Sequence, residues 1–405
     1  MSEWIKFNLG ELITIKHGYA FSGKYITSVK NNNILVTPGN FKIGGGFKAD
    51  KFKYFSSDDY PKEYLFDGGE LIVTMTDLSK ETDTLGFVAL VPKDTNKYLH
   101  NQRVGLINIL DESVVDKLYL YWKLRTNEYQ SFIANSASGT SVMHTSPKKI
   151  YEYSFLLPSL IEQTAIASVL SSLDNKIDLL HCQNKTLEAM AETLFRQWFA
   201  DDSNGSGKEV ELHEIIEFNP KRVLPKGSKA MYLEMAGLNT NTFAASGYYE
   251  RDFTSGQKFI KQDTLLARIT PCLENGKAGY VHFLSPEQVG WGSTEFIVLR
   301  PKPKFHPLFS YILCRNNEFK EYAESCMEGS SGRQRVNVSH LSMYTLTLPH
   351  DDVITQFNEI LASIEPKLIS NALQIQTLEN LRDTLLPKLM SGEVRVNYTP
   401  KEIKQ

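Results

Sequence analysis

Two long stretches of the chain share one spacing of hydrophobic positions. In residues 157–199 apolar side chains recur at alternating steps of four and three, and residues 348–389 repeat that outline. This spacing keeps one face of an α-helix apolar, and a narrow seam of this kind is typical of coiled coils. We therefore predict one long helix in each stretch. The residues of the helix-pairing seam are Leu173, Ile177, Leu180, Asn184, Leu187, Leu194, Trp198, Phe357, Leu361, Ile364, Leu368, Asn371, Ile375, Leu378 and Leu385.

Each seam contains one asparagine, which favours pairing of the two predicted helices with each other. A buried asparagine is costly unless it finds a polar partner, so Asn184 and Asn371 are expected to meet. An antiparallel pairing with that contact also sets Trp198 opposite Phe357. The alternative is that each amphipathic helix packs on its own globular domain.

Pro366 lies inside the second stretch. A proline in a helix interior removes a backbone hydrogen bond and kinks or breaks the helix. The second stretch is therefore expected to form a short helix followed by a longer one, and the phase of its seam depends on that break.

The similarity between the two halves extends beyond the helices. Seam positions correspond at a constant offset of 191 residues. Three further pairs of segments follow in the same order: 9–15 with 212–218, 71–91 with 265–284, and 118–140 with 308–332. In the last pair, Tyr121 and Arg125 stand in step with Tyr311 and Arg315. Four matching segments in one order predict an internal duplication.

Each half reads as a globular domain followed by a long helix. Short apolar or alternating runs between Gly, Asn and Asp turns predict mostly antiparallel strands. Residues 116–136 and 306–325 each predict a single helix. The predicted fold class is α+β, with a pseudo-two-fold internal repeat and an antiparallel pair of long helices. The predicted parts are a first globular domain (1–156), a central helical spacer (157–200), a flexible linker (201–210), a second globular domain (211–347), a C-terminal helical spacer (348–395) and a tail (396–405).

Composition is that of an ordinary globular protein. The mean hydropathy is −0.28, and no apolar run approaches the roughly 18–20 residues that a membrane span needs. The start of the chain lacks a secretory signal, and the four cysteines show no paired spacing, so we expect a cytoplasmic protein without a disulfide framework.

The charge of the two globular halves is close to balanced. Residues 1–158 carry 18 Lys/Arg against 17 Asp/Glu, and residues 212–348 carry 16 against 13. This balance neither requires nor excludes a nucleic-acid partner.

Motifs of common catalytic sites are absent from the sequence. There is no GxxxxGK[ST] phosphate loop, no HExxH, no GxSxG and no Asn/Asp-Pro-Pro-aromatic motif of amino-methyltransferases. The nine histidines form no cluster with metal-ligand spacing. We therefore predict no catalytic residue, no metal site and no cofactor in this chain. A nuclease built from dispersed Asp, Glu and Lys remains open.

The repeated helices carry a specific resemblance. The first begins with Leu-Pro and contains a P-x-x-x-E-Q-x-x-I pattern at Pro158, Glu162, Gln163 and Ile166. The second also begins with Leu-Pro but departs from that pattern, because its glutamine, Gln356, is shifted by two positions. Together with two variable globular domains, these helices resemble the specificity subunit of type I DNA restriction-modification systems.

That resemblance implies a function and partners. Each globular domain would be a target recognition domain reading half of a split double-stranded DNA site, and the two helices would set the gap between the halves. Two methyltransferase subunits would dock on the helices and bring the S-adenosylmethionine chemistry. A separate restriction/translocase subunit would use ATP and Mg²⁺.

Candidate DNA contacts are polar residues on predicted loops. Base edges are read by Arg, Asn, Gln, Ser and Thr, and phosphates are bound by Lys and Arg. The candidates in the first domain are Lys42, Lys48, Thr74, Thr76, Gln102, Arg103, Ser138 and Thr140. Those in the second are Arg268, Thr270, Ser293, Thr294, Arg333, Gln334 and Arg335, with Thr270 taken as the counterpart of Thr76.

Two other classes of protein remain as alternatives. One is a stand-alone or fused site-specific endonuclease or methyltransferase. The other is a coiled-coil scaffold that binds protein and no DNA.

Overall fold

The computed structural model describes residues 4–49, 51–77, 84–139, 142–200, 207–240, 242–330 and 332–396. Thr140, most of the predicted linker and most of the predicted tail lie outside these ranges. The chain divides into two compact units. Unit 1 is Met1–Asn175 with Glu379–Gln405, and unit 2 is Lys176–Leu378. Each unit thus combines one globular domain with a part of both long helices.

Unit 1 contains two main sheets. An antiparallel sheet has the order β2-β11-β7-β9, and a five-stranded sheet has the order β3-β5-β4-β10-β6, in which β10 and β4 are parallel. The β-branched and apolar side chains of β7 and β4 are buried, as expected for central strands. The strands are β1 (Ile5–Asn8), β2 (Ile13–His17), β3 (Ile26–Thr27), β4 (Asn33–Val36), β5 (Lys53–Phe55), β6 (Leu65–Phe66), β7 (Leu71–Thr74), β8 (Thr76–Asp77), β9 (Val88–Leu90), β10 (Lys97–His100), β11 (Val104–Ile109), β12 (Met143–His144) and β13 (Ser154–Leu157).

Unit 2 repeats this plan. Its sheets have the orders β15-β22-β19-β20 and β17-β16-β21-β18, and β16 and β21 are parallel. The short pairs β14–β25 and β23–β24 complete it. The strands are β14 (Lys208–Glu211), β15 (Ile216–Phe218), β16 (Lys229–Leu233), β17 (Tyr249–Asp252), β18 (Gln257–Ile260), β19 (Thr264–Ala267), β20 (Ala278–Tyr280), β21 (Val289–Gly292), β22 (Phe296–Pro301), β23 (Met327–Glu328), β24 (Arg335–Val336) and β25 (Thr345–Leu348).

The helical pattern of each domain divides into two helices where one was predicted. Thr126 accepts a hydrogen bond from Tyr129 N and begins α2, while Asn316 accepts one from Phe319 N and begins α7. An N-cap in extended conformation starts a new helix in a new direction. The short helices of the two domains are α1 (Lys117–Lys123), α2 (Asn127–Ser136), α3 (Pro147–Tyr151), α5 (Leu212–Ile215), α6 (Phe309–Arg315), α7 (Asn317–Ser325) and α8 (Val338–Leu341).

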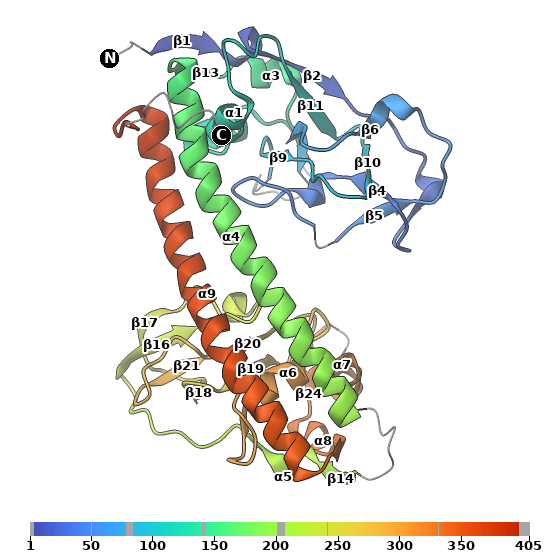
Figure 1. The fold of residues 1–405 in the computed structure, drawn as a ribbon, viewed down its shortest axis with the longest axis vertical. Coiled ribbons are helices and arrows are strands. Elements are labelled where there is room, and N and C mark those ends of the chain that lie inside the picture. Colours follow the sequence, from blue (N-terminus) through green and yellow to red (C-terminus); the bar gives the residue numbers. More distant parts are fainter. Residues whose placement is uncertain are drawn as a thin grey trace. The chain divides into compact units, whose positions relative to one another are not determined.

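The two long helices are α4 (Leu160–Phe195) and α9 (Asp351–Ser391). A π-helical turn, Arg196–Ala200, extends α4. In each unit α4 and α9 lie side by side (Figure 1). No helix in the described part of the chain is long and apolar enough to cross a membrane.

The predicted break at Pro366 is wrong, because α9 continues through this residue. Pro366 faces solvent, whereas Ile364, Glu365 and Leu368 around it are buried against unit 2. Proline removes one backbone donor, and the packing of its neighbours keeps the helix continuous.

Both long helices complete the hydrophobic core of each unit. In unit 1, Ile166 and Leu170 of α4 join the core with Leu389 of α9. In unit 2, Phe195 of α4 joins the core with Phe357 of α9. Each of the two predicted helical spacers is therefore shared between unit 1 and unit 2, and neither forms a separate domain.

Candidate nucleic-acid interface

Three short segments of unit 2 meet at the end of β19. They consist of residues 268–270, 293–295 and 333–335, and we call them the unit 2 loop cluster. Arg268 N donates a hydrogen bond to Glu295 O over 3.0 Å, and Thr270 N donates one to Gln334 O over 3.1 Å. All seven predicted DNA contacts of the second domain lie in this cluster: Arg268, Thr270, Ser293, Thr294, Arg333, Gln334 and Arg335.

The exposure of these side chains differs. Thr294 and Arg333 are exposed, and Ser293 and Gln334 are half-buried. Arg268 is also half-buried, and its Nη2 donates to Val336 O over 3.2 Å. Thr294, Arg333 and Arg335 are therefore the exposed side chains among the predicted contacts of the cluster.

Arg335 forms an ion pair with Glu295 across the cluster. Its Nε lies 2.9 and 3.0 Å from the two carboxylate oxygens, and its Nη2 lies 2.7 Å from Oε1. The arginine side chain is 46% exposed and the glutamate side chain 21%. Glu295 was absent from the sequence-based candidates, because nothing in the linear pattern links it to a residue 40 positions away.

Unit 1 builds the same arrangement at the end of β7. Met75 N donates to Arg103 O over 3.1 Å, as Arg268 N does to Glu295 O. Thr145 N donates to Met75 O over 3.1 Å, as Val336 N does to Arg268 O over 2.8 Å. Ser138 and His144 exchange backbone hydrogen bonds of 3.0 and 2.8 Å. Residues 74–77, 101–103 and the described part of 138–145 thus form a unit 1 loop cluster. Its exposed predicted contacts are Gln102, Arg103 and Ser138.

The structure contradicts two of the predicted DNA contacts, Thr74 and Thr76. Thr74 is 0% exposed and its hydroxyl donates to Thr76 O over 2.9 Å. Thr76 is 5% exposed, and its hydroxyl lies 3.4 Å from His144 Nδ1. Buried hydroxyls with partners inside the protein cannot reach a base edge. The counterpart of Thr76 is Ile269 rather than Thr270, because Thr76 pairs with His144 as Ile269 pairs with Arg335.

Residues 42–46 form a closed turn beside the unit 1 sheets. Lys42 N donates to Gly46 O over 2.9 Å, and Gly46 N donates to Val88 O over 2.8 Å. Gly45 has φ +85, and a Cβ there would lie 2.6 Å from Cγ of Arg125, so the turn requires glycine at this position. Lys42 is exposed at the start of this turn, and Lys48, two residues beyond its end, is half-buried.

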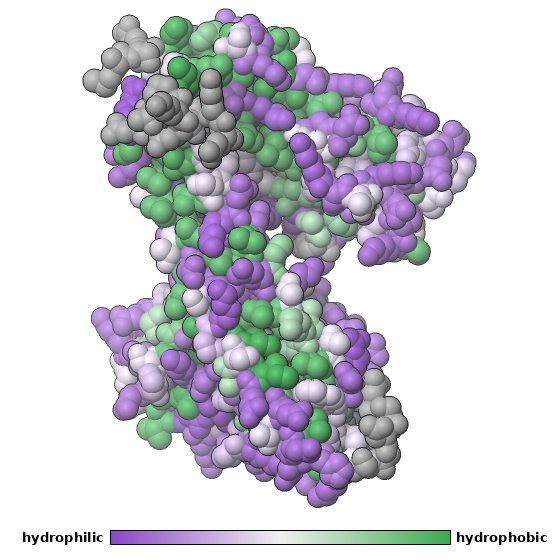
Figure 2. Space-filling view, viewed as in Figure 1, coloured by the Kyte–Doolittle hydropathy of each residue, from purple (hydrophilic) through white to green (hydrophobic). Residues whose placement is uncertain are grey.

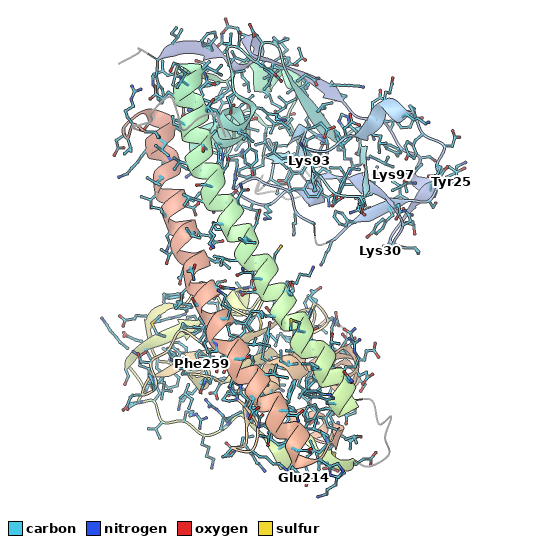
Figure 3. All side chains as sticks on the ribbon, viewed as in Figure 1. Tyr25, Lys30, Lys93, Lys97, Glu214 and Phe259 are labelled. Carbon is cyan, nitrogen blue, oxygen red and sulfur yellow. The ribbon has the colours of Figure 1, made fainter. Side chains whose placement is uncertain are left out.

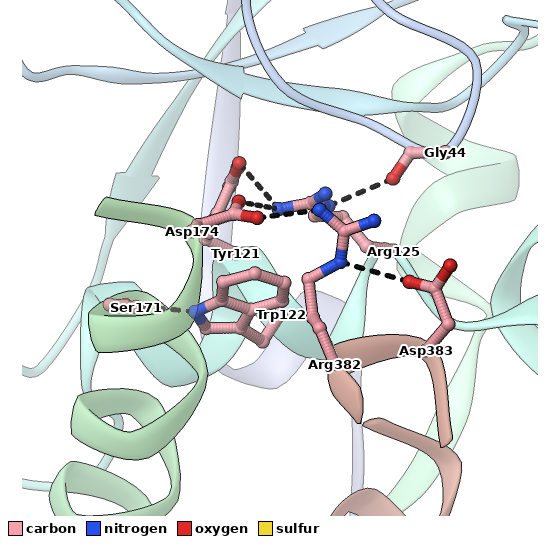
Figure 4. Close-up of polar contacts among 8 residues, drawn as sticks. All are labelled: Gly44, Tyr121, Trp122, Arg125, Ser171, Asp174, Arg382 and Asp383. Atoms are coloured by element: carbon pink, nitrogen blue, oxygen red, sulfur yellow. Dashed lines mark hydrogen bonds and ion pairs between the residues drawn. The ribbon is translucent and has the colours of Figure 1, made fainter. Parts of the chain in front are cut away.

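Arg125 joins this turn to both long helices (Figure 4). Its Nε donates to Gly44 O over 2.8 Å, and its Nη1 donates to Asp174 Oδ2 over 2.9 Å. Arg382 of α9 binds the other oxygen of Asp174 over 2.6 Å. Burial by itself would raise the pKa of Asp174, but Arg125 and Arg382 lower it overall. Asp174 therefore stays ionised as the shared partner of two arginines.

Arg315 has the corresponding place in unit 2. It donates to four backbone carbonyls, those of Thr240, Gly276, Thr242 and Ala278, at 2.7 to 3.3 Å. Its Nε donates to the hydroxyl of Tyr311, which donates to Glu188 of α4 over 2.5 Å. Burial raises the pKa of Glu188 to about 7. The repeat sets Arg125 in step with Arg315, but the sequence pattern by itself gives neither residue a role.

The helix-pairing seam places polar and aromatic partners together in unit 2. Asn371 Nδ2 donates to Asn184 Oδ1 over 2.8 Å. Trp198 and Phe357 meet edge to face with ring centroids 5.9 Å apart. Ile177, Leu180, Ile375 and Leu378 form one apolar cluster. The helices thus pair with each other and also pack on the globular domains, so both expected modes of packing occur together.

Several lysines are exposed around the five-stranded sheet of unit 1. Lys97 lies in β10 and Lys30 and Lys93 lie on neighbouring loops, and all three are exposed, as is Tyr25 (Figure 3). Lys24 lies over the Tyr25 ring, with Nζ 4.5 Å from its centroid. Hydrophilic residues predominate on the face of this sheet that is visible in Figure 2. Such a surface can bind phosphates without reading sequence.

Metal-binding chemistry finds no support in the residues that the structure describes. No group of three or more His, Cys, Asp or Glu side chains in these ranges could hold a metal ion.

A family model and similar proteins of known function all indicate the same family. The family model described as Type I restriction modification DNA specificity domain matches residues 1–189 and 206–380. The MjaIX specificity subunit of a type I restriction enzyme from Methanocaldococcus jannaschii is 23% identical over 346 residues, which cover 77% of this chain and 76% of that protein. The HindI specificity subunit from Haemophilus influenzae is 23% identical over 344 residues, covering 66% and 75%.

A solved structure has a similar fold. The type I restriction-modification S subunit from M. genitalium superimposes with a TM-score of 0.56 at 18% identity, covering 98% of this chain and 97% of the other. At this identity the likeness concerns the fold alone. The match of the family model over both halves is what decides the classification: this chain belongs to the family of type I restriction modification DNA specificity domains.

Proposed function

We propose that this chain is the DNA-recognition subunit of a type I restriction-modification complex and that it binds a split double-stranded site. The observation that supports this most directly is the pair of loop clusters. Both are built on the same backbone hydrogen bonds at the end of a buried strand, yet they carry different polar side chains. The two clusters share one backbone framework but present different side chains to the bases, as is expected for the recognition of two different half-sites.

The proposed direct contacts are the accessible residues of these clusters. In unit 1 they are Gln102, Arg103 and Ser138, with Lys42 and Lys48 as phosphate contacts. In unit 2 they are Thr270, Ser293, Thr294, Arg333, Gln334 and Arg335. Arginine and glutamine suit guanine and adenine edges in the major groove, whereas serine and threonine accept either.

Partner subunits are proposed to bind the long helices. Ile161, Leu179, Met190, Leu373 and Leu381 are large apolar residues on α4 and α9 that are 44–53% exposed. We propose that two methyltransferase subunits cover them and carry the S-adenosylmethionine chemistry. A restriction/translocase subunit would then supply the reactions that need ATP and Mg²⁺.

The decisive experiment begins with methylation mapping in cells that carry the chain with its methyltransferase subunits. We expect one split motif in which two short specific sequences flank a fixed number of unspecified bases. Competition binding with the purified complex should then show lower affinity when either half-site is scrambled. Methylation without a common motif, or binding that is equal for all duplexes, would contradict the proposal.

The two alternative functions have their own tests. The pure chain incubated with DNA and either Mg²⁺ or S-adenosylmethionine is expected to leave DNA uncut and unmethylated, and activity in either reaction would support an enzyme. A gel shift on mixed-sequence duplexes tests the protein-only scaffold, which would give no shifted band.

A further inference from the structure

Arg103 and Glu295 occupy the same backbone position in the two domains. The carbonyl of Arg103 accepts from Met75 N, and the carbonyl of Glu295 accepts from Arg268 N. Two residues earlier, a polar side chain fixes each turn. Asn101 Oδ1 accepts from Arg103 N over 3.0 Å, and Ser293 Oγ accepts from Glu295 N over 3.1 Å. At this one backbone position, unit 1 therefore has a positively charged residue and unit 2 a negatively charged one.

The neighbouring strand supplies a second pair of equivalent positions. His144 lies opposite Thr76, and Arg335 lies opposite Ile269. In unit 2 the two positions hold a carboxylate and a guanidinium, which bind each other. In unit 1 they hold a guanidinium and an imidazole, and Arg103 is exposed with no side-chain partner among the described residues.

The ion pair uses only one edge of the Arg335 guanidinium. Nε and one N–H of Nη2 point at Glu295. The other edge, formed by Nη1 and the second N–H of Nη2, has no partner among the residues that the structure describes. Two parallel N–H donors match the O6 and N7 acceptors of guanine, and an arginine already held in place loses less freedom on binding.

We propose that Glu295 is a positioning residue that orients Arg335 to read one guanine of the half-site bound by unit 2. The equivalent position of unit 1, Arg103, makes a direct contact with its own half-site. One backbone position therefore sets base preference in both domains, through an orienting carboxylate in one and a reading guanidinium in the other. This inference rests on the proposed function, because it assigns the two loop clusters to DNA.

The test uses the complex of the full chain with its methyltransferase subunits and a library of duplexes with every single base-pair change in both half-sites. The variants are Glu295→Ala, Arg335→Lys and Arg103→Ala, with Glu250→Gln on the exposed strand β17 as the control. Thermal melting of each complex checks that folding is unchanged. Glu295→Gln keeps the shape of the side chain if the alanine variant folds poorly.

Glu295→Ala and Arg335→Lys should each lower the preference for guanine at one shared position of the second half-site by roughly tenfold. Both should leave the first half-site unchanged. Arg103→Ala should relax preference in the first half-site only, and the control should bind as wild type.

Three results would overturn the inference while leaving the proposed function intact. They are an unchanged guanine preference in Glu295→Ala, a loss that is equal for all duplexes, and a lost preference for cytosine, which would make Glu295 itself the reader. A wild-type complex without any preferred site would instead refute the proposed function, and the inference with it.

Discussion

Asn371 donates a hydrogen bond to Asn184 over 2.8 Å, and both side chains are buried between α4 and α9. Asn371 Oδ1 has no hydrogen-bond partner in the described structure. The pair is therefore a polar contact in an apolar seam that is only partly satisfied. Such a contact favours one register of the helices over others at some cost in stability.

Replacing one member of this pair should destabilise the helix pairing more than replacing both. Asn184→Leu removes the short hydrogen bond of the buried Asn371 amide and leaves it only the 3.4 Å contact with Gln183 Oε1, at a cost of about 1–3 kcal/mol. The double variant with Asn371→Leu should recover much of that loss, because two apolar side chains of similar size then meet. Chemical denaturation of the two single variants and the double variant measures the coupling. Additive losses would show that the two side chains do not act as a pair.

Asp174→Ala should destabilise unit 1 by about 3 kcal/mol at pH 7, since it leaves the buried Arg125 without its carboxylate. The pKa of Asp174 is lowered in the folded protein, so its contribution is present above the ordinary value of 3.8 and is lost as the pH falls through the lower folded value. The difference between wild type and variant should accordingly shrink below pH 3.8.

Hydrogen exchange provides the local measurement for Asp174. The amide of Gly46 should exchange faster in the variant, because Arg125 no longer fixes the turn through Gly44. Asp178→Ala, at an exposed position of the same helix, should have little effect. Equal exchange in both variants would contradict the role of Asp174.

Glu188→Gln should flatten the pH dependence of unit 2 stability. Burial raises the pKa of this carboxyl from 4.5 to about 7 in the folded protein. A raised pKa of an acid means that the folded state binds the proton more tightly, so stability falls as the pH rises from 4.5 to about 7. Denaturation at several pH values should show this fall in wild type and in the exposed control Glu359→Gln, and not in Glu188→Gln. A parallel fall in all three proteins would assign it to other groups.

Arg315→Lys should cost unit 2 about 3 kcal/mol or more, because one ammonium group cannot replace a planar guanidinium that binds four backbone carbonyls. Arg333→Lys is the matched control, since Arg333 is exposed and should stay within about 0.5 kcal/mol of wild type. Thermal unfolding compares the two. Similar melting temperatures would show that the loops do not depend on Arg315.

Arg333→Ala should weaken DNA binding by about 1–3 kcal/mol if its side chain reads a base. The loss should be confined to duplexes with an intact second half-site, as measured by competition binding. A uniform loss on all duplexes would identify a phosphate contact, and an unchanged affinity would remove Arg333 from the interface.

Much of the helical architecture could be predicted because helical periodicity is a local property. The seam around Asn184 and Asn371 follows from steps of three and four along the chain, and the offset of 191 residues reveals the duplication without any knowledge of contacts. The division at Thr126 was missed, since a threonine within an apolar pattern does not by itself mark the start of a helix.

Other features depended on what surrounds a residue in space. Pro366 stays helical because its buried neighbours hold α9 together, and Thr74 is buried because its strand lies inside a sheet. The pairing of Glu295 with Arg335 and the sharing of Asp174 by Arg125 and Arg382 join positions 40, 49 and 208 residues apart. The sequence alone determined which segments repeat and which faces are apolar, because those patterns arise between near neighbours. The tertiary structure alone decided which polar groups meet and which stay accessible, because that depends on distant segments excluding water from the same place.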